Sequence, residues 1–188
     1  LANTPASFEP TLDYVVTKVA RFPFDKFSDA SNKLGTQMKA TGEVMSIGRT
    51  MEESLLKAMR SLETGVCHIY HKKFDDWTND RLLEYIAEPT DDRLYAIAQL
   101  IRGGVDLVLI YNRTKIDMFF LEKFKNIVEF ERVVEAAPMD IEVLREAKRM
   151  GFSDKFIGQL WGVSQHDMYL LREKNGIFPV YKMIDTCA

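Results

Sequence analysis

Residues 50–65 read TMEESLLKAMRSLETG and carry the clearest helix signal in the chain. Thr50 and Glu53 have the spacing of a capping box. In this motif the threonine oxygen accepts a hydrogen bond from the backbone amide of Glu53, and the Glu53 carboxylate accepts one from the backbone amide of Thr50. Apolar residues then recur at helical spacing at Leu55, Ala58, Met59 and Leu62. Gly65 ends the element. The stretch therefore predicts an amphipathic helix that begins at Thr50.

The helical pattern continues from Thr50 toward the end of the chain, and we expect about eight helices. The expected N-caps after Thr50 are Thr78, Thr90, Asp106, Asp117, Asp140, Ser153 and Ser164. The expected breaks are Pro89, Gly103-Gly104, Pro138, Gly151, Gly162 and Gly176. A long helix opens at Asp117, and its predicted buried side carries Phe120, Phe124, Ile127 and Val128.

The first fifty residues differ from the rest, because they hold three of the six prolines and two strand-like runs. Tyr14–Val19 is β-branched and aromatic, and residues 38–47 form a looser run. An aromatic loop, FPFDKF at 22–27, lies between them, and the tail from Phe178 is extended again. We therefore predict a mainly α fold, a multi-helix domain with a small β-containing N-terminal segment, and a composition break at Thr50.

The composition is typical of an ordinary soluble domain. The chain has 188 residues, of which 46% are apolar and 28% charged, and its net charge is −3. These values exclude collagen, intrinsic disorder and a disulfide scaffold. No apolar run approaches the roughly 20 residues that span a bilayer. The chain also does not open with a basic segment followed by an apolar run, which is the pattern of an export signal. We therefore expect a cytoplasmic protein in which Cys67 and Cys187 are free thiols.

Catalytic and metal-binding patterns are mostly missing from the sequence. It contains no Gly-Lys pair for a Walker A loop and no G-x-G-x-x-G. Cys67, His68 and His71 lie close together, with Asp75-Asp76 beyond, and could in principle hold zinc. No second ligand pair completes four-coordination, so a polar loop after the first helix is the favoured interpretation. Adjacent carboxylates such as Glu52-Glu53 suit helix N-termini better than acid–base catalysis.

Residues 152–172 offer an alternative function, because they have the spacing of a helix-turn-helix. The predicted helices Ser153–Trp161 and Ser164–Arg172 are joined through Gly162-Val163. A DNA-binding protein with this motif would place the second helix in the major groove. That helix carries nearly balanced charges, whereas DNA affinity requires a basic surface. DNA binding therefore remains the alternative to a structural helix pair.

Several motifs resemble one family along the whole chain. They are Thr4–Pro10 (TPASFEP), Asp13–Lys18 (DYVVTK), Gly42–Thr50 (GEVMSIGRT), Thr114–Asp117 with Phe120-Leu121, Gly151–Asp154 (GFSD), Pro179–Lys182 (PVYK) and Asp185–Ala188 (DTCA). In this order they resemble the large subunit of the glutamine-hydrolysing carbamoyl phosphate synthetase.

The resemblance implies a domain assignment. The family's large subunit has two ATP-grasp halves, an all-helical oligomerisation domain between them and a C-terminal allosteric domain. Residues 1–49 correspond to the end of the first, carboxyphosphate-forming half. Residues 50–188 correspond to the oligomerisation domain and its exit linker, which agrees with the break at Thr50. The resemblance thus implies an internal fragment of a longer chain.

The resemblance also implies an activity for the full-length enzyme. That enzyme makes carbamoyl phosphate from bicarbonate, glutamine-derived ammonia and two ATP for arginine and pyrimidine synthesis, with Mg or Mn, K and a glutaminase small subunit. The family's ATP-grasp sites use a Glu-x-Asn-Pro-Arg run and Gly-rich phosphate loops, and neither occurs here. We therefore expect no catalytic, cofactor-binding or metal residues in this chain. The expected role is a self-associating scaffold that binds neither nucleic acid nor membrane.

Overall fold

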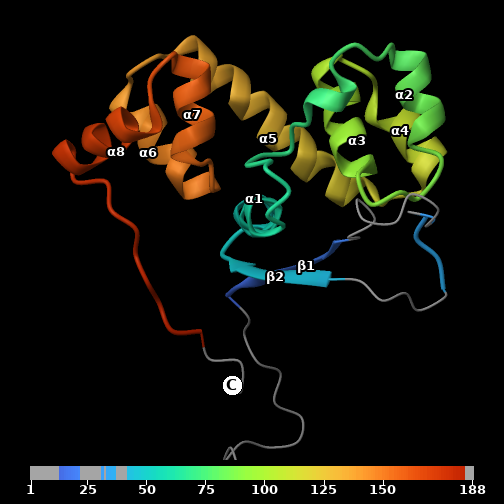
Figure 1. Ribbon diagram of the computed structural model, residues 1–188, viewed down its shortest axis with the longest axis horizontal. Helices are drawn as coiled ribbons and strands as arrows, with labels where there is room; N and C mark the ends of the chain where they lie inside the picture. The colour runs from blue at the N-terminus through green and yellow to red at the C-terminus, as the bar shows by residue number, and fades with distance from the viewer. Residues whose placement is uncertain (1–12, 22–30, 32, 37–41, 185–188) are drawn as a thin grey trace, which may run out of the picture.

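A computed structural model of the chain describes residues 13–21, 31, 33–36 and 42–184. This part contains a two-stranded sheet and eight α-helices (Figure 1), so the predicted mainly α fold with a small β segment is confirmed. The elements in chain order are β1 (Val15–Arg21), β2 (Gly42–Gly48), α1 (Met51–Ser61), the 3-10 turn η2 (Lys72–Phe74), α2 (Asn79–Tyr85), α3 (Arg93–Arg102), α4 (Leu107–Thr114), α5 (Met118–Ala136), α6 (Ile141–Met150), α7 (Asp154–Trp161) and α8 (Gln165–Lys174).

Strands β1 and β2 pair with each other in antiparallel register, from Val15 opposite Gly48 to Arg21 opposite Gly42. The sheet lies against α1 (Figure 1). Its contact is polar, because the hydroxyl of buried Ser54 lies 2.8 Å from Thr17 Oγ1 and the Ser46 hydroxyl donates to the Ser54 carbonyl. The predicted strand at 14–19 is confirmed. The predicted strand at 38–47 is found at 42–48, while residues 38–41 and the aromatic segment 22–27 lie outside the described residues.

The capping box predicted at Thr50 is confirmed, except that Glu53 accepts from the amide of Arg49, the residue before the N-cap, and not from the amide of Thr50 itself. Thr50 Oγ1 accepts from the Glu53 amide at 3.2 Å, and the Glu53 carboxylate accepts from the amide of Arg49 at 2.8 Å. Helix α1 then buries its apolar side at Leu55, Leu56, Ala58 and Met59. The side chain of Thr50 thus satisfies the amide of Glu53 in the first turn of α1.

The predicted caps at Thr78, Asp106, Asp117, Asp140, Ser153 and Ser164 all accept from a backbone amide of the helix that follows. The prediction for Thr90 is wrong, because α3 begins only after Asp92. Thr90 instead forms an isolated β-bridge with Lys33, and the Leu34 amide donates to the carbonyl of Pro89 at 2.7 Å. This pairing with a distant segment delays the start of the helix.

Helix α5 is the axis of the described helices. In Figure 1 it runs between a group made of α2, α3 and α4 and a group made of α6, α7 and α8, with α1 near its middle. It packs against α1, α3, α4, α6 and α7. The prediction that Phe120 lies on its buried side is wrong, because that ring is 42% exposed while Leu121 is fully buried. The predicted stripe is confirmed at Phe124, Ile127 and Val128, and differs only at its N-terminal end, where Leu121 takes the buried position.

The α7–α8 pair packs so closely that Gly158 has no room for a side chain. A Cβ at this position would lie 2.5 Å from the Val163 carbonyl oxygen and 3.4 Å from Met168 Cγ. We predict that Gly158→Ala lowers the free energy of unfolding by about 1–3 kcal/mol, because the helices must move apart. Urea denaturation would measure this change.

Gln159→Ala is the matched control, since its side chain is exposed on the same helix. Alanine normally stabilises a helix relative to glycine by about 0.5–1 kcal/mol. A Gly158→Ala protein as stable as the unmodified chain, or more stable, would therefore contradict the close packing of α7 on α8.

Candidate functional site

The three residues considered as zinc ligands point to different places. His71 caps η2, since its Nδ1 accepts from the Lys73 amide at 3.0 Å. Cys67 is half-buried with a free thiol, and His68 is buried. Among the described residues, no group of three or more His, Cys, Asp or Glu side chains is arranged to hold a metal ion. The structure therefore does not bring Cys67, His68 and His71 together as a ligand set.

The predicted polar loop after the first helix is found between α1 and η2, but its His68 is buried, with 1% of its surface exposed. Its ring stacks on the ring of Phe156 of α7, with centroids 3.7 Å apart. It also makes a tilted contact with the ring of Phe152, with centroids 4.7 Å apart. Its Nε2 lies 2.9 Å from Oε1 of Glu131 on α5. The loop thus inserts an imidazole between the long central helix and the C-terminal helix group.

Glu131 is the centre of a buried cluster. It accepts two hydrogen bonds from Arg102 of α3, Nη2 to Oε1 at 2.7 Å and Nε to Oε2 at 2.8 Å. Arg102 Nη2 also donates to the carbonyl of Ile69 at 3.0 Å. A bidentate arginine and an imidazole thereby compensate a carboxylate that is only 8% exposed. The cluster joins α3, α5 and the loop that carries His68.

Burial and partner charges act against each other in this cluster. For Glu131, burial raises the pKa, but the hydrogen bonds from Arg102 and His68 together outweigh it, so the pKa lies below its ordinary value and the carboxyl is ionised. For His68, burial lowers the pKa and outweighs the hydrogen bond with Glu131, while Arg102 and Arg60 lower it too. His68 is therefore neutral, and its Nε2 proton is donated to Glu131.

Sequence reasoning did not identify Arg102 or Glu131. The available signal was the position of Glu131, which falls on the apolar stripe of α5 together with Ile127, Val128 and Val134. A carboxylate on a buried helical stripe requires a cationic partner. The partner is distant in sequence, so spacing alone does not identify it.

In the helix pair considered for DNA binding, Arg172 makes internal contacts, while Lys155 and Lys174 are exposed. Arg172 donates from Nη2 to Asp154 Oδ2 at 2.7 Å and from Nη1 to the carbonyl of Ile177 at 3.0 Å. Lys148 Nζ lies 3.0 Å from Asp154 Oδ1. Although burial raises the pKa of Asp154, these cations lower it below its ordinary value. Arg172 and Lys148 thus stabilise the start of α7 rather than face a phosphate.

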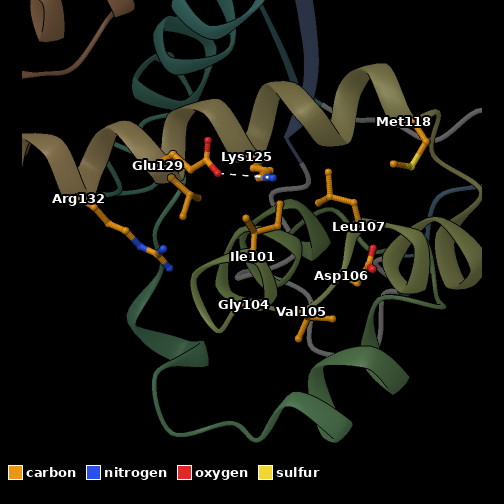
Figure 2. A pocket seen from close by; sticks show the side chains of 10 residues that line it. Ile101, Gly104, Val105, Asp106, Leu107, Met118, Lys125, Glu129 and Arg132 are labelled. Atoms are coloured by element: carbon orange, nitrogen blue, oxygen red, sulfur yellow. Dashed lines mark ion pairs between the residues drawn. The ribbon is translucent and has the colours of Figure 1, made fainter.

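Large apolar side chains are exposed on the surface around α4 and the start of α5. Val108, Leu109, Tyr111, Phe119 and Phe120 are exposed there. Beside them lies a cavity of about 490 Å³ between the α3–α4 connection and α5. Figure 2 shows Ile101 and Leu107 within it and the ion pair of Lys125 with Glu129 at its α5 side. An apolar floor with charged edges is typical of a surface that another macromolecule covers.

A family match and the character of the helices indicate what kind of protein this is. The sequence model of one family, described as carbamoyl-phosphate synthetase large chain, oligomerisation domain, matches residues 43–176. The matched region contains all eight helices of the described part. Separately, none of these helices has the length and apolar character needed to cross a bilayer.

The buried neutral histidine predicts a pH dependence of stability. His68 has a pKa below its ordinary value of 6.5 in the folded chain, so the unfolded chain binds this proton more readily. Its contribution to stability is fully present above pH 6.5 and is lost as the pH falls toward the lowered value. We therefore expect the free energy of unfolding to decrease between pH 7 and pH 5, as measured by urea denaturation.

His68→Phe removes this titration and keeps a ring against Phe156, so its stability should change less over the same pH interval. His166→Gln is the matched control, because His166 lies exposed on α8. If the unmodified chain and His68→Phe lost stability in parallel from pH 7 to pH 5, the assignment of a neutral buried His68 would be wrong.

Proposed function

This chain belongs to the family of the carbamoyl-phosphate synthetase large chain, oligomerisation domain, and we propose from that membership that it is an assembly scaffold of such a synthetase. The observation that carries the proposal is the extent of the match, residues 43–176, which includes α1 through α8. The family's description implies self-association. The exposed apolar side chains of α4 and α5 supply surface that a partner subunit can bury.

The scaffold is proposed to work inside a longer enzyme. Residues 1–49 then belong to the end of the first ATP-grasp half, and residues 50–188 lead toward the second. The sheet of β1 and β2 packs on α1, which supports a firm junction between the two parts. The helices would hold the two halves at a fixed separation.

The full enzyme is proposed to make carbamoyl phosphate from bicarbonate, glutamine-derived ammonia and two ATP, in the cytoplasm and with a glutaminase subunit as partner. ATP with Mg or Mn, and K, would act in its ATP-grasp halves. We assign no catalytic residue to this chain, because its sequence has neither the Glu-x-Asn-Pro-Arg run nor the Gly-rich phosphate loops of those halves. Its residues would position the catalytic parts.

Self-association is the activity expected of the purified chain itself. Sedimentation equilibrium from about 1 to about 100 µM, the range in which moderate interfaces dissociate, should show the mass rising from the 21.7 kDa monomer to a dimer or larger species. A monomer over the whole range would contradict the scaffold proposal.

The second expected outcome concerns catalysis. Purified chain with ATP, Mg and K should release no phosphate in response to bicarbonate, because we assign it no nucleotide-binding residues. A coupled phosphate assay measures this, with an added ATP-grasp enzyme as positive control. Bicarbonate-dependent hydrolysis that co-purifies with the chain would overturn the non-catalytic role.

A further inference from the structure

Helix α4 is apolar on the side that it does not use for packing. Ile110 is fully buried, whereas Val108 and Leu109 are 52% and 51% exposed and Tyr111 is 38% exposed. An eight-residue surface helix normally carries polar side chains on its outer side. The exposed fractions of Leu109 and Val108 show that this side of α4 is open to solvent.

Three exposed residues of α4 and its N-cap form a stripe with opposite charges at its ends. Asp106, Leu109 and Arg113 stand at i, i+3 and i+7, which places them on one face of the helix. Asp106 caps the N-terminus through Oδ1, which accepts from the Val108 amide at 2.8 Å, and Arg113 lies in the last turn. Among the described residues, no ion-pair partner is found for Arg113.

This arrangement is complementary to itself. A second α4 laid antiparallel across the first, about a two-fold axis beside Leu109, places Leu109 against Leu109. Asp106 of each copy then faces Arg113 of the other, and the two helix dipoles oppose each other favourably. A two-fold contact requires such a patch, because each residue must meet its complement on an identical surface.

A cavity lies on the other side of α4, because Leu107, which lines it, is two positions from Leu109 and so points to the opposite side of the helix. Its walls include Leu107 of α4 and Met118 of α5, and its edge carries Glu129 and Arg132. Figure 2 shows Asp106 at the α4 side and Lys125 and Glu129 on α5, so acidic and basic groups are found at its borders. The cavity is therefore not part of the contact at Leu109, which rests on the stripe of Asp106, Leu109 and Arg113.

We propose that two copies of this chain associate through antiparallel α4 helices, with Leu109 at the two-fold axis and Asp106 paired with Arg113 of the other copy. The inference rests on the proposed scaffold function and specifies its contact face. Leu109 is the anchor of this contact, and the ion pairs fix its antiparallel direction.

The test compares Leu109→Glu with Leu170→Glu by sedimentation of the full chain. Leu170 lies on α8 and is 45% exposed, close to the 51% of Leu109, so the two changes are chemically matched. Leu109→Glu should weaken dimerisation at least about 30-fold, because it places two charges at an apolar contact. Leu170→Glu should leave the dissociation constant unchanged. Circular dichroism should show equal helix content in both variants.

Arg113→Glu tests the direction of the contact. The substitution sets a second carboxylate against Asp106 of the other copy and should weaken dimerisation about 3- to 10-fold. Adding Asp106→Asn keeps an N-cap side chain and removes the repulsion, so the double variant should recover part of the loss. A double variant no better than Arg113→Glu would contradict the antiparallel pairing.

The outcomes separate the contact face from the scaffold function. If the unmodified chain and Leu109→Glu dimerise equally well, the α4 face is wrong and self-association stands on another surface. If Leu170→Glu rather than Leu109→Glu dissociates the chain, the contact lies on α8 and the inference is overturned. If the unmodified chain stays monomeric throughout, the scaffold proposal fails together with this inference.

Discussion

The buried carboxylate of Glu131 is the constraint on which the arrangement of the helices depends. It lies on α5 and is held by Arg102 from α3 and by His68 from the loop after α1. Leaving a buried carboxylate without its cation costs about 3–5 kcal/mol, a large part of the stability of a domain. The positions of α3 and of the His68 loop along α5 are therefore coupled, since neither can shift without incurring this penalty.

His68 extends the constraint to the other helix group, because its ring stacks on Phe156 of α7. A second attachment lies nearby, where the indole nitrogen of Trp161 donates to the carbonyl of Val134 on α5 at 2.6 Å. Both helix groups are thus fastened to one long helix by directional contacts as well as by apolar packing. The proposed role between two enzymatic halves would require this kind of rigidity, because a flexible connector would not fix their distance.

This chain has charged groups in its core and large apolar side chains on its surface, and these two features have different explanations. Inside, Glu131 and Arg102 place charge in the core, and the hydrogen bonds from Arg102 and from the neutral His68 compensate the carboxylate. Outside, Leu109 and Phe119 place apolar area in water without compensation. The inner cluster explains how the helices stay in position. The outer surface is the one on which the proposed self-association would bury apolar area.

The sequence by itself determined the helices, because caps act within a few residues: Asp106, Asp117, Asp140, Ser153 and Ser164 each satisfy amides of the next turn. Local signals were insufficient wherever a distant residue intervened. The bridge to Lys33 displaced the expected cap at Thr90, the packing of α5 turned Phe120 outward, and Glu131 brought His68 into the core. Tertiary structure alone decided these positions, since long-range partners meet only after the chain has folded.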